Sequence, residues 1–62
     1  MPTARFYKVE AGDITMVDGS TYKIDPLDEP RVRWWKQLDE IRIDIASLTN
    51  MRTNENVRAT LL

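Results

Sequence analysis

The sequence predicts an α+β fold, in which a small three-stranded antiparallel β-meander is followed by one amphipathic α-helix packed on its apolar face. Two observations predict this fold. β-branched and aromatic residues are frequent in the first 24 residues and are interrupted by glycine-containing turns. By contrast, residues 30–49 place large apolar side chains three and four residues apart, as on one face of a helix. Because no linker or repeat divides the chain, we expect a single domain over residues 1–62.

Three strands are predicted near residues 4–10, 14–17 and 20–24. Side chains alternate between the two faces of a strand, so the length of each turn decides which residues lie opposite one another. A three-residue turn, Val17-Asp18-Gly19, aligns Ile14 with Tyr22, whereas a two-residue Asp18-Gly19 turn would scatter the large apolar groups over both faces.

The first turn of the meander is predicted to be Gly12-Asp13, with glycine at the first central position. This turn places Val9 opposite Met16 and on the face of the sheet that carries Ile14. The same alternation directs Phe6 to the opposite face.

One helix is predicted over residues 30–49, with Pro30 at its first position and the acidic residues Asp28 and Glu29 just before it. Its apolar face is expected to cover the sheet. That face consists of Trp34, Leu38, Ile41, Ile45 and Leu48.

The C-terminal segment, residues 50–62, allows two predictions. Asn50 is a plausible helix stop, and Thr53 or Asn54 could then cap a second, short helix. Alternatively, the first helix continues through Met51.

Several apolar groups remain outside this expected core and predict a contact surface, because large apolar side chains at the centre of an interface supply most of the binding energy. With the basic end of the helix, the candidate partner-interface residues are Phe6, Val32, Arg33, Trp35, Ile43, Leu61 and Leu62. In the alternative, the C-terminal segment folds over Trp35 and Ile43 and makes them core. Accordingly, Leu38→Ala is expected to unfold the domain, and Trp35→Ala to abolish association without unfolding it.

No catalytic, cofactor-binding or metal-binding residue is predicted. The chain has no cysteine and no histidine, so the usual thiol and imidazole nucleophiles, bases and metal ligands are missing. Its two glycines do not form a phosphate-binding loop, and its carboxylates do not match a calcium loop. We therefore expect neither an enzyme nor a small-molecule substrate.

Charge and hydropathy narrow the class of partner. A net charge of −1 disfavours non-specific binding to nucleic acid, although Arg31–Lys36 interleaves basic and aromatic residues as single-strand binders do. No apolar stretch approaches the roughly 20 residues that span a bilayer, so no membrane partner is expected. The expected partner is a protein, either another copy of the chain or a different one.

Residues Ile14 to Leu48, a hairpin closed by Val17-Asp18-Gly19 and followed by one amphipathic helix, resemble the hairpin-helix part of the small head-completion proteins of tailed phages. That family begins with a helix, whereas Arg5–Glu10 predicts a strand. The resemblance therefore covers part of the chain, and no functional residue is carried over from it.

The expected function is that of a small non-enzymatic interaction or structural protein, such as a viral assembly component that self-associates or docks in a larger particle. It would act in the cytoplasm or within a virion. The alternative is a small inhibitor or adaptor that binds one host protein through the helix end at Trp34 and Trp35.

Overall fold

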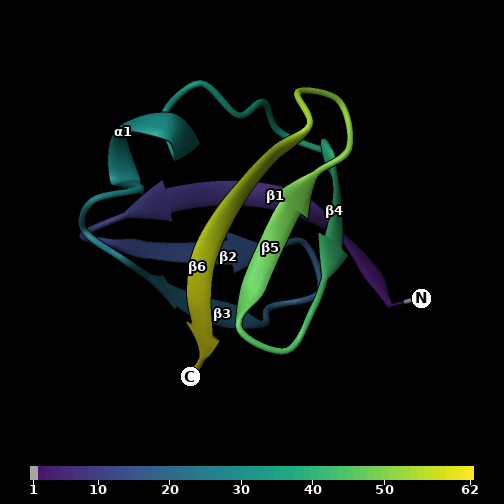
Figure 1. The fold of residues 1–62 in the computed structure, drawn as a ribbon. Coiled ribbons are helices and arrows are strands. Elements are labelled where there is room, and N and C mark those ends of the chain that lie inside the picture. Colours follow the sequence, from purple (N-terminus) through teal and green to yellow (C-terminus); the bar gives the residue numbers. More distant parts are fainter. Residues whose placement is uncertain (1) are drawn as a thin grey trace.

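The computed structural model describes residues 2–62, which form a closed barrel of six antiparallel strands (Figure 1). Around the barrel the strands follow the order β1-β2-β3-β6-β5-β4, and β4 pairs with β1 to close it. A single helical turn, α1 (Glu29–Val32), lies in the connection between the two halves. The strands are β1 (Thr3–Glu10), β2 (Asp13–Met16), β3 (Thr21–Ile24), β4 (Glu40–Ile43), β5 (Ser47–Asn50) and β6 (Glu55–Leu61).

The α+β prediction is wrong, because the long helix expected over residues 30–49 does not form. Only its first residues are helical, and β4 and β5 occupy its second half. Ile41 and Ile43 are β-branched and two residues apart, a pattern that suits a strand and lowers helix propensity. Long-range pairing decides the outcome, since β4 completes the sheet beside β1, with Ala4 opposite Ile41.

The C-terminal segment is also a strand rather than the short helix that the sequence allows. β6 pairs with β5 on one side and with β3 on the other, placing Ile24 opposite Ala59. Its Val57 and Ala59 are buried, whereas Arg58 and Thr60 between and after them are exposed. This period of two is the strand pattern that the helical interpretation overlooked.

The first three strands coincide within about one residue with the positions that the sequence predicts. The register of β2 and β3 places Ile14 opposite Tyr22, as the three-residue turn requires. The predicted first turn is wrong: the turn residues are Ala11 and Gly12, both with left-handed φ angles of 53° and 81°. This geometry matches the twist of a two-residue hairpin and sets Val9 opposite Ile14 instead of Met16.

A β-bulge in β1 explains why Phe6 points inward instead of outward. The pairing with β2 shifts between Phe6 and Lys8, so β1 carries one extra residue there. Phe6 lies opposite Met16 and is buried, whereas the neighbouring Tyr7 is about half exposed.

The core fills the inside of the barrel and draws side chains from both halves of the chain, as well as from α1 and the loop after it. Within it the rings of Phe6 and Trp35 meet edge to face, with centroids 5.7 Å apart. The buried hydrophobic residues are Phe6, Ile14, Met16, Tyr22, Ile24, Val32, Trp35, Ile41, Leu48, Val57 and Ala59.

The predicted apolar stripe is therefore only partly a core. Ile41 and Leu48 are buried, but the other three members, Trp34, Leu38 and Ile45, are exposed. A helix would have directed all five to one side, whereas the observed loop and strands direct them to different sides of the barrel.

Within residues 2–62 the helical segment is far too short to cross a membrane.

Candidate functional site

The loop between α1 and β4, residues 33–39, is the most distinctive surface feature of the barrel and is called the Trp34 loop below. It carries two adjacent tryptophans with opposite environments: Trp35 is 6% exposed and Trp34 is 77% exposed. Backbone N–H groups of both residues donate to carbonyls one turn earlier, Trp34 to Arg31 and Trp35 to Val32. This tight turn directs one ring into the core and the other into solvent.

The side chain of Trp35 attaches the Trp34 loop to the core of the barrel. Its ring packs against Phe6, and its indole Nε1 donates a hydrogen bond of 3.2 Å to Glu55 Oε1 at the start of β6. A buried tryptophan with a satisfied N–H combines a large apolar contact with a directional one, and it therefore fixes the position of the residues beside it.

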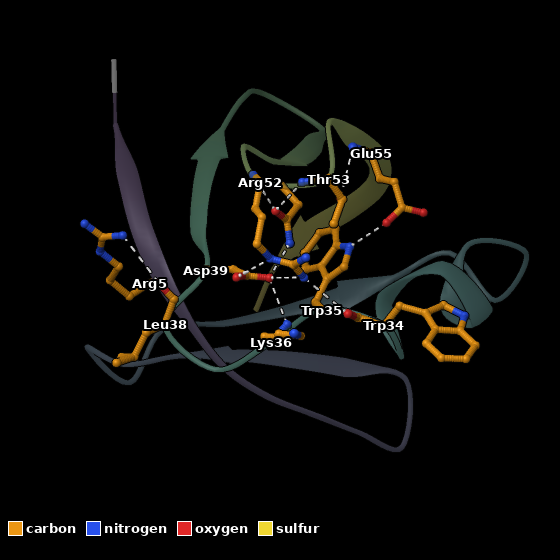
Figure 2. A network of polar contacts seen from close by, with 10 residues as sticks. Arg5, Trp34, Trp35, Lys36, Leu38, Asp39, Arg52, Thr53 and Glu55 are labelled. Atoms are coloured by element: carbon orange, nitrogen blue, oxygen red, sulfur yellow. Dashed lines mark hydrogen bonds and ion pairs between the residues drawn. The ribbon is translucent and has the colours of Figure 1, made fainter.

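Asp39, at the end of the Trp34 loop, is the centre of a polar network (Figure 2). Its side chain is 7% exposed, and its Oδ2 accepts hydrogen bonds from the Lys36 backbone N at 2.8 Å and from Asn50 Nδ2 at 2.9 Å. Arg52 binds both carboxylate oxygens, Nε to Oδ1 at 2.8 Å and Nη2 to Oδ2 at 2.9 Å. This two-pronged geometry is the strong form of an arginine–carboxylate pair.

The network holds Asp39 in its charged form. The hydrogen bonds from Arg52 lower the pKa of Asp39 well below its usual range; burial acts in the opposite direction, and the bonds from Asn50 and the Lys36 N–H add to the lowering. The same pairing raises the pKa of Arg52. A charged group at this position ties the Trp34 loop to the β5–β6 turn, residues 51–54.

The β5–β6 turn is itself organised by Asn50, whose side chain is completely buried between these elements. Its Oδ1 accepts hydrogen bonds from the backbone N–H groups of Arg52 and Thr53. Asn50 therefore fixes the turn that positions the guanidinium of Arg52, while its Nδ2 binds Asp39.

Further hydrogen bonds attach the Trp34 loop to β1 and to Arg52. The Leu38 N–H donates to the Phe6 carbonyl at 2.7 Å, and the Phe6 N–H donates to the Asp39 carbonyl at 2.9 Å. Arg5 Nη1 reaches the Leu38 carbonyl, and Arg52 Nη2 reaches the Trp34 carbonyl, both at 3.4 Å. The backbone of the loop is thus anchored on both sides while the side chain of Trp34 stays free.

Leu38 has an unusual backbone conformation. Its φ is 74°, in the left-handed region, and its side chain is 61% exposed. Bulky residues rarely adopt this conformation because the Cβ approaches the following carbonyl oxygen. The loop therefore holds an exposed apolar side chain at a position that glycine or asparagine would occupy with less strain.

Basic residues outnumber acidic ones in the two segments that form this surface, and the carboxylates of Glu29 and Glu55 lie at its edge. The segments 31–39 and 51–54 contain four basic residues and one acidic residue, whereas the rest of the chain contains five basic and nine acidic residues. Arg33, Lys36 and Arg52 are exposed, although Arg33 pairs with Glu29 at 3.5 Å. We define the basic Trp34 surface as Arg33, Trp34, Lys36, Leu38 and Arg52.

The structure separates the interface residues that the sequence predicts. Phe6, Val32 and Trp35 lie in the core, so they cannot contact a partner while the barrel is closed, and Ile43 is half buried on β4. Arg33 is exposed and belongs to the basic Trp34 surface. The exposed Leu61 and Leu62 lie at the far end of β6 from the Trp34 loop (Figure 1).

Sequence reasoning missed Trp34 and Leu38 as surface residues because both fitted the helical stripe. The usable signal was local: Arg31–Lys36 interleaves basic and aromatic residues, a composition that suits an exposed binding surface better than a core.

One other feature lies outside the basic Trp34 surface. An open groove of about 390 Å³ is lined by Lys23, Ile24, Asp25, Pro26, Ala46, Arg58, Ala59 and Thr60. Among residues 2–62 no group of acidic side chains is arranged to hold a metal ion.

No family model, no curated protein and no solved structure matches the chain. The resemblance to phage head-completion proteins rested on a hairpin followed by an amphipathic helix, and that helix is absent.

Proposed function

We propose that this barrel is a non-enzymatic interaction module that binds a protein partner through the Trp34 loop. The observation that carries the proposal is an indole that is 77% exposed on a loop anchored by buried neighbours. A tryptophan at this exposed position adds nothing to the packing of the core, and contact between its apolar ring and water is unfavourable.

Rigidity supports an interaction role over a merely tolerated surface residue. Binding costs free energy when loops and side chains must be ordered, so a loop that is ordered beforehand binds more tightly. The anchors described above, Trp35 in the core and the Asp39–Arg52 pair, order the loop before any partner arrives. Tryptophan and arginine are also the residue types most often found to dominate binding energy at interfaces.

The proposal also includes the cellular location of the protein. The chain has no cysteine, whereas small extracellular domains commonly depend on disulfides, which favours the cytoplasm or a particle assembled there. Both functions expected from the sequence, a structural component and a small inhibitor or adaptor, use a protein contact. The adaptor function invoked both Trp34 and Trp35, and since Trp35 is buried, Trp34 alone supports it here.

The test is a selection of short random peptides displayed on phage against the wild-type barrel, with counter-selection against Trp34→Ala. We expect enriched peptides that bind the wild type and lose binding to Trp34→Ala. Ile45→Ala is the matched control, because Ile45 is fully exposed in the β4–β5 turn and lies outside the Trp34 loop. If every enriched peptide binds Trp34→Ala as well as the wild type, the proposed function is wrong.

A further inference from the structure

We propose that the partner of the basic Trp34 surface is an acidic protein segment with apolar side chains on both sides of its acidic residues. This inference rests on the proposed function and specifies the chemistry of the partner. It follows from the charge of the surface, from its alternation of apolar and basic groups, and from the strain at Leu38.

The charge of the surface differs in sign from that of the rest of the molecule. As counted above, the segments 31–39 and 51–54 are basic and the remainder of the chain is acidic. Attraction between surfaces of opposite charge speeds association and selects the orientation of binding, whereas repulsion between like charges disfavours wrong partners. An acidic segment would thus be drawn to the Trp34 loop more than to the rest of the molecule.

Some of the positive charge is available for a ligand. Among residues 2–62, Lys36 makes no ion pair, and the hydrogen bonds of Arg52 use its Nε and Nη2. Arg52 therefore retains Nη1 for a further acceptor, while its side chain is already held in place by Asp39. A guanidinium fixed in this way binds a carboxylate with little loss of side-chain entropy.

The apolar groups flank this positive charge. Figure 2 shows Trp34 and Leu38 on opposite sides of the Asp39–Arg52 pair, with Arg5 beside Leu38. A partner that places a carboxylate at Arg52 would therefore have room for one apolar side chain against Trp34 and a second against Leu38. The pattern of the surface, apolar, basic and apolar, is complementary to an apolar, acidic and apolar segment.

The strain at Leu38 adds an independent argument. Its left-handed backbone disfavours a bulky side chain, and its exposed side chain contributes little to the core. An exposed residue held in a strained conformation is a candidate for a functional contact.

A single-stranded nucleic acid would use the same cations, and the surface favours it less. Binding of successive bases uses several aromatic rings in a row, whereas the apolar group that accompanies Trp34 here is the aliphatic Leu38. The net negative charge of the rest of the chain would also repel a long polyanion.

The experiment starts from the peptides whose binding depends on Trp34. We expect these sequences to be enriched in Asp and Glu beside large apolar residues. The strongest binder is then synthesised together with a version in which each Asp is replaced by Asn and each Glu by Gln. The acidic peptide is expected to bind about tenfold more tightly than the amide version, and this advantage should shrink as salt rises.

Variants locate the contact. Lys36→Gln should weaken binding of the acidic peptide several-fold and leave the amide peptide unchanged, whereas Lys23→Gln, on the exposed face of β3, is the matched charge control. Leu38→Asn should weaken both peptides, because it removes an apolar contact and no charge.

Each contrary result has a distinct meaning. Trp34-dependent peptides that are neutral or basic would overturn the acidic partner and leave the proposed function intact. A labelled oligothymidylate that binds the wild type and not Trp34→Ala, with no acidic peptide selected, would overturn it in favour of nucleic acid. A dimer in light scattering that disappears in Trp34→Ala would assign the surface to a second copy and overturn it as well.

Discussion

Trp34 and Trp35 are adjacent in the chain, yet the first lies in solvent and the second in the core. Trp35 packs on Phe6 and donates to Glu55, so its ring is part of the structure that closes the barrel. The side chain of Trp34 has no such role, and only its backbone is held. The comparison teaches that one short loop can bury one tryptophan in the core and hold the adjacent one in solvent.

The Asp39 network supports this difference by holding the loop in place. Asp39 accepts a hydrogen bond from the Lys36 backbone N–H and joins the loop to Arg52. Substitutions of the buried tryptophan, of the Asp39 network and of the exposed side chains should therefore differ in the size and in the sign of their effect on the free energy of unfolding.

The largest loss of stability is expected when the buried tryptophan is replaced. Trp35→Ala, which the sequence predicts to leave the fold intact, should instead destabilise the barrel by about 3–5 kcal/mol, because it removes a large buried ring and leaves a cavity. Trp34→Ala should change the free energy of unfolding by less than about 0.5 kcal/mol, as exposed substitutions usually do. Denaturant unfolding measures both values, and equal losses would show that Trp34 is not a free surface residue.

A milder variant keeps this comparison informative if Trp35→Ala does not fold. Trp35→Phe retains an aromatic ring but loses the hydrogen bond to Glu55. It should cost about 1–3 kcal/mol, and the folded variant should still bind Trp34-dependent peptides.

An intermediate effect is expected at the network. Asp39→Asn should cost about 2–3 kcal/mol near neutral pH, because a charged acceptor of four hydrogen bonds becomes a neutral amide with one acceptor oxygen. Asp44→Asn, which breaks the exposed pair with Arg42, is the control and should cost little.

The wild type and Asp39→Asn should also differ in how their stability depends on pH. Since Arg52 lowers the pKa of Asp39 in the folded state, this carboxylate stabilises the fold above its unfolded pKa of about 4. That contribution is lost as pH falls through the still lower pKa of the folded protein. Thermal unfolding from neutral to strongly acidic pH should therefore show the stabilities of the wild type and Asp39→Asn converging below about pH 4, and a constant difference would contradict this role.

A small effect of opposite sign is expected at the exposed and strained residue of the Trp34 loop. Leu38→Asn should stabilise the barrel by about 0.5–1 kcal/mol, because asparagine tolerates a left-handed φ better than leucine. If Leu38 contacts a partner, the same variant should bind peptides less tightly. Lower stability in this variant would mean that the leucine side chain supports the fold.

The sequence predicts the first half of the fold better than the second. Strands β1 to β3 are short, β-branched and separated by glycine turns, and the register of Ile14 with Tyr22 follows from counting. The bulge in β1 could not be predicted, because no residue type requires it, and it reversed the orientation of Phe6.

The second half failed because two periodicities coexist in it. Trp34, Leu38 and Ile41 fit a helical stripe, while Ile41 and Ile43 fit a strand. Partners far away in the sequence settle the choice, β1 for β4 and β3 for β6, and no window of local sequence contains them. The candidate site followed the same error, since the helical stripe placed Trp34 inside and Trp35 outside.

The way in which the barrel closes also has a kinetic consequence. Strands β1 to β3 and strands β4 to β6 each form a meander of neighbouring hairpins, which assemble from local contacts. The two meanders meet at seams that join residues more than thirty positions apart, such as Ala4 with Ile41 and Ile24 with Ala59. Contacts between such distant residues form only after the entropy of closing a long loop has been lost. The pairing of these strands should therefore limit the folding rate, as in other barrels dominated by non-local pairing.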